Sequence, residues 1–259
     1  MDTTPAPSGP RVSVCMAVYN GARWLTPQLE SILGELRSDD EIVIVDDAST
    51  DDSVALIEAL DDPRVRMVRH DANRGYVATF EHALSLATRD VILLSDQDDV
   101  WIRGRRDLLC AAVESADVAA SDLVLLGDGA PLPHPLTRRP WRLGRSRRSD
   151  RIRRQLTIWA GVAPYFGCAM AVRREFLSTV LPFPTFLTES HDLWIATAAN
   201  AAAALEHVHS PSVQRRLHEA NASPSRPRGV RAVLRARVML VRCSMEAVRR
   251  TRGQSRSRS

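Results

Sequence analysis

The stretch VILLSDQDDVW (Val91–Trp101) joins an uninterrupted apolar run to three carboxylates. Its first residues are apolar and β-branched or aliphatic, which predicts a strand that is covered on both faces. Asp96, Asp98 and Asp99 follow where that strand would end. Carboxylates this close together repel one another, so we expect a neighbouring group to neutralise them.

Strand and helix patterns alternate with short connections from residue 12 to about residue 116. Strands are predicted over 12–18, 41–47, 64–70 and 91–95, and helices over 26–36, from about residue 50, over 76–87 and over 105–116. In the first helix, Thr26 is expected to cap and Pro27 to take the first helical position. This alternation predicts an α/β fold with a mostly parallel central sheet that is flanked by helices.

Polar side chains gather at the carboxyl ends of three predicted strands. Tyr19 and Asn20 follow the first strand, Asp46 and Asp47 end the second, and the Asp96 cluster ends the fourth. Ligands of open parallel sheets bind beyond these ends. The sequence therefore predicts one binding site there.

The remaining segments are less regular. We expect a strand over 117–126, a short helix over 151–159, a strand that runs into a helix at Arg174, and an alanine-rich helix that begins at His191 or Asp192. Residues 1–10 contain little to bury and are predicted to be a disordered leader. One main domain over 11–222 is expected, followed by a basic tail over 223–259 that is helical until its unstructured end, GQSRSRS (253–259).

Composition excludes several classes of protein. No stretch has the roughly 18 apolar residues in succession that a membrane span requires, and the N-terminus lacks the layout of a secretion signal, so a cytosolic protein is predicted. The four cysteines form no Cys-x-x-Cys pair, which argues against a zinc knuckle or a disulfide framework. We expect them to be buried and reduced.

The cationic charge is entirely arginine and is concentrated in two segments. The net charge is +4, with nine arginines in 138–154 and eleven in 226–258. Two interpretations remain open, a solvated face and a surface that meets an anionic partner. Few aromatic residues are interleaved, so nucleic acid is not the expected partner.

The acidic strand ends each allow two interpretations. Asp96-x-Asp98 at a strand end is suited to Mg²⁺ or Mn²⁺, and the alternative is a solvated acidic turn. Asp46 and Asp47 can bind a hydroxyl or a base N–H, and the alternative is that one of them caps the next helix. The usual dinucleotide, P-loop and serine-hydrolase motifs are missing, so a different nucleotide-binding arrangement is implied.

Taken as a set, these motifs resemble the nucleotide-sugar-binding half of glycosyltransferase family 2. The set comprises Val14-x-x-Ala17-x-Tyr19-Asn20-Gly21, Ile44-Val45-Asp46-Asp47-Ala48-Ser49-Thr50-Asp51, Asn73-Arg74-Gly75 and Asp96-Gln97-Asp98-Asp99. The resemblance implies a GT-A nucleotide-diphospho-sugar transferase fold, with 11–116 as the nucleotide-sugar-binding half and 117–222 as the acceptor half.

The resemblance also implies a nucleoside site. Ala17 and Tyr19 would lie against the nucleobase, and Asn20 belongs to the same donor site. Asp47 would accept a hydrogen bond from the base N3–H, and Asp46 would lie toward the ribose.

A diphosphate and metal site is implied beside it. Arg74 would face the nucleotide or its sugar, with Gly75 allowing a tight turn. Asp98 would hold Mg²⁺ or Mn²⁺, while Asp96 and Gln97 contact the donor and Asp99 is a supporting, hydrogen-bonded acid. A divalent cation stabilises the charge that develops on the departing nucleoside diphosphate.

Asp192 matches the family's catalytic base, the acid at a helix start that takes the proton of the acceptor hydroxyl. An in-line attack with inversion at the anomeric carbon would follow. The alternative is that His191 and Asp192 only cap the helix. Since a helix N-terminus favours a carboxylate, Asp192 is expected to have a low pKa.

The segment after residue 214 most resembles the rhamnosyltransferase-type branch of the family. Arg216, His218 and Asn221 match its motif, while Arg215 stands in place of a tyrosine and Glu219 in place of a glycine. The match implies that His218 reaches the metal or the diphosphate and that Arg216 contacts the phosphates.

The predicted function is an inverting, metal-dependent hexosyltransferase. Its donor would be dTDP-rhamnose or another dTDP- or UDP-hexose, and its acceptor a cell-surface polysaccharide or lipid-linked saccharide. The basic tail would attract an anionic membrane surface, so a cytoplasmic or peripheral location at the inner face of the membrane is expected. The alternatives are a polyprenyl-phosphate glycosyltransferase and a non-catalytic protein that binds nucleotide sugars or nucleic acid.

Overall fold

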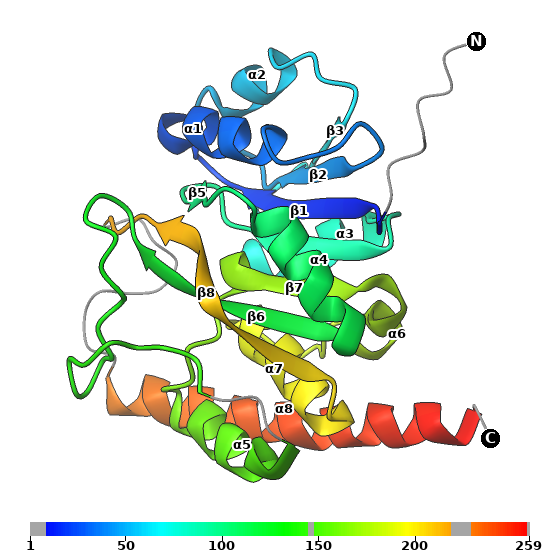
Figure 1. Ribbon diagram of the computed structural model, residues 1–259, viewed down its shortest axis with the longest axis vertical. Coiled ribbons are helices and arrows are strands. Elements are labelled where there is room, and N and C mark those ends of the chain that lie inside the picture. Colours follow the sequence, from blue (N-terminus) through cyan, green and yellow to red (C-terminus); the bar gives the residue numbers. More distant parts are fainter. Residues whose placement is uncertain (1–8, 145–147, 219–228, 258–259) are drawn as a thin grey trace.

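A single mixed sheet forms the centre of the protein (Figure 1). The computed structural model describes residues 9–144, 148–218 and 229–257. Within them, eight strands are ordered β3-β2-β1-β4-β7-β6-β8-β5. They are β1 (Val12–Val18), β2 (Glu41–Asp46), β3 (Val65–Arg69), β4 (Val91–Ser95), β5 (Val100–Trp101), β6 (Val118–Leu125), β7 (Met170–Arg173) and β8 (Leu205–Arg215).

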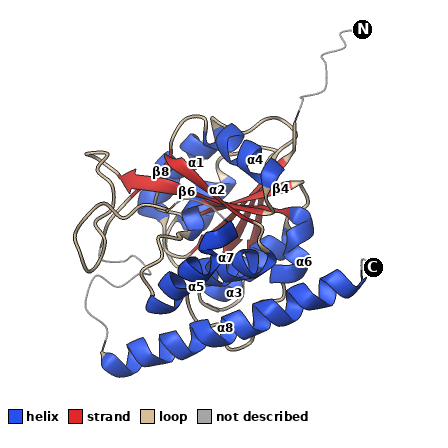
Figure 2. Ribbon diagram, turned by 60° about the horizontal axis from the view of Figure 1, so that its bottom comes forward, coloured by secondary structure: helices blue, strands red, loops and turns tan. Residues whose placement is uncertain are grey.

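Helices cover both faces of the sheet. The α-helices are α1 (Ala22–Leu33), α2 (Ser53–Glu58), α3 (Tyr76–Leu86), α4 (Arg105–Ser115), α5 (Arg151–Ala160), α6 (Leu177–Val180), α7 (His191–Ala202) and α8 (Val230–Ser257). Apolar residues of α1, α2 and α4 join one core cluster, and those of α3, α5, α6, α7 and α8 join the other. The long helix α8 lies outside α5 and α7 (Figure 2). The expected α/β architecture is confirmed.

The parallel part of the sheet follows the alternation seen in the sequence. Strands β3, β2, β1 and β4 pair in parallel, so their carboxyl ends meet at one edge. The second half departs from this pattern, because β7 runs antiparallel to β4 and β6, and β5 antiparallel to β8. Strand β8 was not predicted. Its sequence contains Pro211, and proline within a run of residues argues against a strand. Its pairing with β6 shifts register twice, so the strand is irregular.

Two predicted helix starts were wrong. Helix α1 begins at Ala22 rather than at Thr26, so Pro27 lies inside it. The early start is possible because the exposed N–H of Ala22 donates to Oδ2 of Asp51, at 3.0 Å. Helix α2 begins at Ser53 rather than near residue 50, where the loop is held by contacts with the end of β1.

The C-terminal prediction is correct for the helix and wrong for its end. Helix α8 continues to Ser257, so most of 253–259 is helical. Three predicted segments lie outside the described residues in whole or in part: 1–8 of the leader, 219–228 before the helix, and 258–259. Among the residues that the structure describes, no helix combines the length and the apolar character needed to cross a membrane. All four cysteines are buried with free thiols, as expected.

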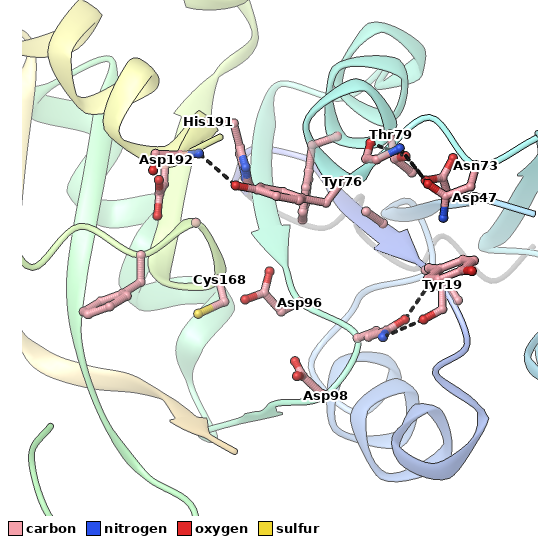
Figure 3. A pocket seen from close by; sticks show the side chains of 18 of the residues that line it. Tyr19, Asp47, Asn73, Tyr76, Thr79, Asp96, Asp98, Cys168, His191 and Asp192 are labelled. Carbon is pink, nitrogen blue, oxygen red and sulfur yellow. Dashed lines mark hydrogen bonds between the residues drawn. The ribbon is translucent and has the colours of Figure 1, made fainter. Parts of the chain in front are cut away.

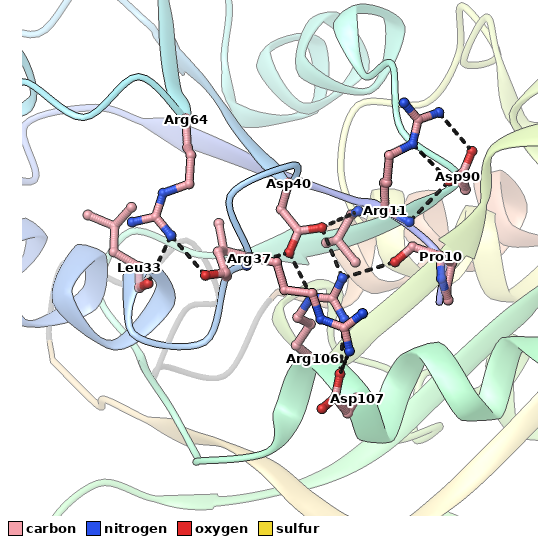
Figure 4. A network of polar contacts seen from close by, with 11 residues as sticks. Pro10, Arg11, Leu33, Arg37, Asp40, Arg64, Asp90, Arg106 and Asp107 are labelled. Carbon is pink, nitrogen blue, oxygen red and sulfur yellow. Dashed lines mark hydrogen bonds and ion pairs between the residues drawn. The ribbon is translucent and has the colours of Figure 1, made fainter. Parts of the chain in front are cut away.

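A buried ion pair ties the start of β1 to helix α4 (Figure 4). The Asp40 carboxylate accepts hydrogen bonds from the N–H of Val12 at 2.7 Å and from Nε of Arg106 at 2.7 Å. Arg106 also donates to the carbonyl oxygen of Pro10. Both charged side chains are at most 3% exposed. The pair thus holds the first strand in register with the helix that follows the acidic strand end.

We expect Arg106→Met to lower the free energy of unfolding by about 3–5 kcal/mol, because it leaves the Asp40 charge buried without its partner. Urea unfolding followed by circular dichroism measures the change. Arg37→Met is the matched control, since its partner Asp107 is 71% exposed and the loss there should stay below about 1 kcal/mol. Equal losses in the two variants would contradict the prediction.

Candidate active site

The carboxyl ends of β1, β2 and β4 open onto a cavity of about 350 Å³. The starts of α3 and α7 and the end of β8 complete its wall (Figure 3). Of the residues predicted for the site, those in this wall are Ala17, Tyr19, Asp47, Asp96, Gln97, Asp98 and Asp192. Sequence positions up to 175 residues apart therefore converge on one cavity, at the sheet edge where a ligand was expected.

Asp47 is held at one side of the cavity by the loop before α3. Its Oδ1 accepts hydrogen bonds from the N–H of Arg74 at 2.8 Å and from His70 Nδ1 at 2.9 Å, and its Oδ2 accepts from the N–H of Gly75 at 2.8 Å. Burial opposes ionisation of this carboxyl, but the hydrogen bonds outweigh it and lower its pKa. Gly75 has a φ of 82°, which confirms the expected tight turn. Asp47 is thus a fixed anion and acceptor beside Tyr19.

Asp46, Asn20 and Arg74 do not line the cavity. Asp46 is fully buried, and its Oδ2 accepts from the N–H of Ser49 at 3.0 Å, which leaves no exposed surface for the predicted ribose contact. Asn20 accepts from the N–H of Thr50 at 2.8 Å. The Arg74 side chain is exposed. Asp46 and Asn20 thus hold the loops around the site, and the donor contacts predicted for both stay predictions.

Gln97 connects the first strand to the acidic strand end. Its Oε1 accepts from the N–H of Tyr19 at 2.9 Å, and its Nε2 donates to the Tyr19 carbonyl at 3.1 Å. A Cβ at Gly21 would come within 2.4 Å of Gln97 Oε1, so a larger residue there would displace the Gln97 amide from Tyr19. The amide pair fixes the position of Tyr19 relative to Asp96 and Asp98.

The acidic strand end is crowded, as its sequence indicated. Ligand atoms of Asp96, Asp99 and Cys168 lie within 4.8 Å of one another. Burial, followed by the charges of the neighbouring aspartates, raises the pKa of Asp96 well above its usual range. Burial and the Asp98 charge raise the pKa of Asp99 to about 6. The cluster therefore favours a positively charged side chain or ion next to it.

Arg215 supplies one such charge from the end of β8. Its guanidinium lines the cavity and lies 4.9 Å from the ring centre of Phe166. Burial disfavours this cation, but the neighbouring Cys168, Asp96, Asp99 and Asp98 outweigh burial and raise its pKa. Only the departure from the motif's tyrosine marked Arg215 in the sequence, and no role was predicted for it. The structure identifies it as a neutralising partner of the aspartates.

Asp98 is oriented by the segment that follows β8. His218 Nε2 contacts Asp98 Oδ2 at 2.7 Å, and the imidazole stacks on Trp24 with ring centres 4.0 Å apart. Arg216 donates from Nε to the Asp98 carbonyl and from its N–H to Asp99 Oδ1. The predicted hydrogen-bonded role of Asp99 agrees with this geometry. His218 and Arg216 thus contact the acidic loop but are not part of the cavity wall. Direct contact with metal or phosphate stays a prediction for both.

The donor atoms of this strand end suit Mg²⁺ or Mn²⁺. Asp96 and Asp98 present carboxylate oxygens in the cavity, and oxygen is the ligand that these cations prefer. Burial raises the pKa of the Cys168 thiol well above its usual range, so this neighbour stays protonated and is a poor ligand for a hard cation. Asp96, Asp98 and Asp99 crowd this strand end, where burial and the neighbouring charges raise the pKa of Asp96 and Asp99, so a divalent cation fits the charge of the site.

Asp192 lies across the cavity from the acidic strand end, in the first turn of α7 (Figure 3). Its Oδ1 accepts from the N–H of Leu193 at 2.8 Å. The low pKa expected from the helix N-terminus was wrong, because burial raises the pKa of Asp192 to about 6. Desolvation of the carboxylate outweighs the helix terminus here. A carboxyl with this pKa is a stronger base than an exposed aspartate.

His191 is set in an aromatic wall beside Asp192. Its ring stacks on Phe80 at 4.2 Å and meets Tyr76 edge-on at 5.7 Å. Burial lowers the pKa of His191 to about 3, so the imidazole is neutral. The Tyr76 hydroxyl accepts from the N–H of Ser190 at 2.9 Å. This contact ties α3 to the start of α7 and sets the position of Asp192.

The pH dependence of turnover tests Asp192 as a base. A base must be ionised to accept a proton, so kcat/KM is expected to rise with pH through about 6 and then level off. Initial rates between pH 4.5 and 8.5 at saturating cation measure this limb. Because Asp99 also titrates near pH 6, Asp99→Asn is the control and should retain the limb. A flat profile in the intact protein would rule out the assignment.

The arrangement of sheet, acidic strand end and facing helix is the GT-A glycosyltransferase fold. The structure is similar to that of TarS from S. aureus, residues 1–349 in complex with UDP-GlcNAc, with a TM-score of 0.68 and 17% sequence identity. The similarity covers 90% of this chain and 66% of that one. At this identity the likeness concerns the fold alone.

The chain belongs to glycosyltransferase family 2. The sequence model of the family, described as "Glycosyl transferase family 2", matches residues 13–181. This range includes the three acidic or polar strand ends and stops before Asp192. The family resemblance drawn from the sequence motifs is therefore confirmed.

Several relatives match part of the chain. The putative glycosyltransferase EpsE of Bacillus subtilis is 36% identical over 110 residues, covering 41% of this chain and 40% of EpsE. The UDP-Glc:alpha-D-GlcNAc-diphosphoundecaprenol beta-1,3-glucosyltransferase WfaP of Escherichia coli is 32% identical over 91 residues, covering 35% of this chain and 36% of WfaP. This chain thus matches well under half of the length of either relative.

Proposed function

We propose that this protein transfers a hexose from a nucleoside diphosphate sugar to a hydroxyl of a cell-surface polysaccharide or lipid-linked saccharide, with inversion at the anomeric carbon. The observation that supports it most is that two groups of side chains, one suited to a diphosphate and its cation and one suited to accepting a proton, face each other across one cavity. A cluster of aspartates with Arg215 stands on one side, and Asp192, with its raised pKa, stands on the other. Family membership agrees with this assignment.

The nucleotide half of the cavity supports binding of the donor. Tyr19 is 46% exposed at the cavity wall and offers a ring face for a base, and Asp47 offers acceptor oxygens for its N–H. The guanidinium of Arg215 can donate to the diphosphate, and Asp96 and Asp98 would hold Mg²⁺ or Mn²⁺. Such a cation, when bound, stabilises the charge on the leaving nucleoside diphosphate.

The acceptor half supports removal of a proton. Asp192 accepts the proton of the attacking hydroxyl as its oxygen bonds to the anomeric carbon, while the bond from that carbon to the diphosphate breaks on the opposite side. A base and a leaving-group site on opposite walls would allow the two oxygens to lie in line with the anomeric carbon, and an in-line displacement inverts that centre. Tyr76, Phe80 and neutral His191 give the intervening wall an apolar surface on which a sugar ring can pack.

The names of the relatives support a class of substrate. WfaP is named for UDP-glucose and a diphosphoundecaprenol acceptor, and TarS was solved with UDP-GlcNAc. The Arg216 and His218 motif favours dTDP-rhamnose as the donor within this class. We therefore propose a UDP- or dTDP-hexose and an acceptor that is a glycan or is carried on a lipid diphosphate.

A panel of nucleotide sugars tests the proposal directly. The full chain is incubated with each donor and a lipid-linked saccharide extract, with Mg²⁺, with Mn²⁺ or with EDTA, and release of nucleoside diphosphate is measured. We expect release from one or two donors that needs acceptor and cation. Transfer to a bare lipid phosphate would favour the polyprenyl-phosphate alternative. Release from no donor, together with tight, salt-sensitive nucleic-acid binding, would overturn the enzyme assignment.

A further inference from the structure

Helix α8 exposes a continuous apolar stripe. Its members are between 39% and 75% exposed, and they are Val230, Leu234, Val238, Val241, Met245 and Val248. Their spacing of three or four residues places them on one face of the helix. The opposite face is buried in the protein core through Met239, Leu240, Cys243 and Ala247. The helix is therefore apolar on two sides, and only one of them is covered by the fold.

Arginines line one edge of this stripe. Arg231, Arg235, Arg242 and Arg249 each follow a stripe residue directly in sequence, and all four are exposed. One step along a helix turns by about 100°, so the four guanidiniums share one edge. Arg249 is paired with Glu246 at 2.6 Å, and the other three arginines place a row of positive charge beside the aliphatic side chains.

Helix α5 enlarges the same surface. It packs against α8, where Gln155 and Trp159 both donate to Ser244 Oγ, at 2.9 and 2.8 Å. Ile152 and Leu156 are 76% and 54% exposed, while Ile158 on the opposite side of α5 is buried. Helices α5 and α8 lie side by side in both views, so the exposed aliphatic residues of α5 extend the outward face of α8 (Figures 1 and 2).

We infer that this α5–α8 face docks in the plane of an anionic lipid bilayer. Aliphatic side chains enter the boundary between headgroups and acyl chains, while the arginines contact anionic headgroups. A second copy of the chain fits this face less well. The stripe from Leu234 to Val248 has heptad spacing, but Arg235, Arg242 and Arg249 fall at one flanking position, so an antiparallel pair would place arginine against arginine.

Docking here would bring the acceptor half of the cavity toward the bilayer. Helix α8 packs on α7, whose first turn contains Asp192. The Arg242 guanidinium stacks on Phe186 at 4.1 Å, and Met239 Sδ accepts from the Thr188 hydroxyl at 3.8 Å. Both contacts are to the loop that leads into α7. The inference goes beyond the proposed function and does not depend on it, because it concerns a surface outside the cavity.

Sedimentation with lipid vesicles tests the inference. The full chain is mixed with vesicles of phosphatidylcholine alone or with 30% phosphatidylglycerol, at about 0.1 M salt. We expect binding only to the anionic vesicles. R231Q/R235Q should weaken the partition coefficient about 25-fold, at about fivefold per arginine. L234Q/V238Q/V241Q should weaken it at least tenfold, since it removes most of the apolar stripe.

Controls separate docking from folding and from general charge. R66Q/R103Q removes the same charge at exposed positions of the nucleotide half and should bind vesicles nearly as the intact chain does. UDP affinity and the thermal midpoint should be unchanged in all variants. Failure of the intact chain to bind anionic vesicles would overturn the inference, as would equal binding by the stripe variant. A dimer that is lost in the stripe variant, without vesicle binding, would instead assign the face to a second copy.

Discussion

Replacement of Asp192 by asparagine is expected to lower kcat for sugar transfer by about 10²–10⁴-fold, the usual contribution of a general base. Asparagine has nearly the same shape and can still accept from the N–H of Leu193 through its amide oxygen, so the start of α7 should keep its conformation. It cannot take a proton. Initial rates at saturating donor and acceptor measure the loss.

Two further measurements distinguish a base from a residue that only caps the helix. Donor affinity, measured by calorimetry with the nucleoside diphosphate, should change less than about threefold, because Asp192 lies across the cavity from the nucleotide half. Asp128→Asn, at an exposed turn, is the matched control and should retain full activity. If Asp192→Asn kept more than about a tenth of the kcat while the thermal midpoint fell, the capping alternative would stand instead.

Replacement of Asp98 by asparagine is expected to lower kcat/KM by about 10²-fold or more and to raise the cation concentration needed for half-maximal activity. The change removes a carboxylate charge from the cavity wall, and a bound cation contributes several kcal/mol to stabilising the leaving group. Binding of Mn²⁺, followed by paramagnetic resonance in the presence of nucleoside diphosphate, reports the loss independently of turnover.

Asp99→Asn is the matched comparison for Asp98→Asn. Asp99 is buried and its Oδ1 accepts from the N–H of Arg216, a bond that an asparagine oxygen can retain. We expect its kcat/KM to fall less than tenfold and its response to Mn²⁺ to stay near that of the intact protein. Similar losses in both variants would mean that the acidic loop acts as a unit and that Asp98 has no separate role as a ligand.

The nucleotide half could be predicted from the sequence because its signals are local. Strands β1, β2 and β4 are short apolar runs that need no distant information to be recognised, and acids at their ends must meet at one edge once the strands are parallel. The order of motifs then indicated the family. Errors here were small and lay at helix starts, where hydrogen bonds from distant loops decide which residue begins the helix.

The acceptor half depended on contacts that no local pattern shows. Strand β8 contains a proline and shifts register along β6, yet its pairing is what delivers Arg215 and His218 to the acidic strand end. Arg215 helps to neutralise Asp96, Asp98 and Asp99, yet in the sequence it was visible only as a departure from a motif.

The sequence by itself determined the alternation of the sheet, the location of the acidic strand ends and the identity of the residues that meet there. Only the tertiary structure decided their electrostatics. Asp46 and Asp47 are adjacent in sequence, yet Asp46 is fully buried at the end of β2 while Asp47 lines the cavity. Asp192 has a raised rather than a lowered pKa because packing removes water from it. Desolvation depends on every element packed around a group, and residue order along the chain does not specify it.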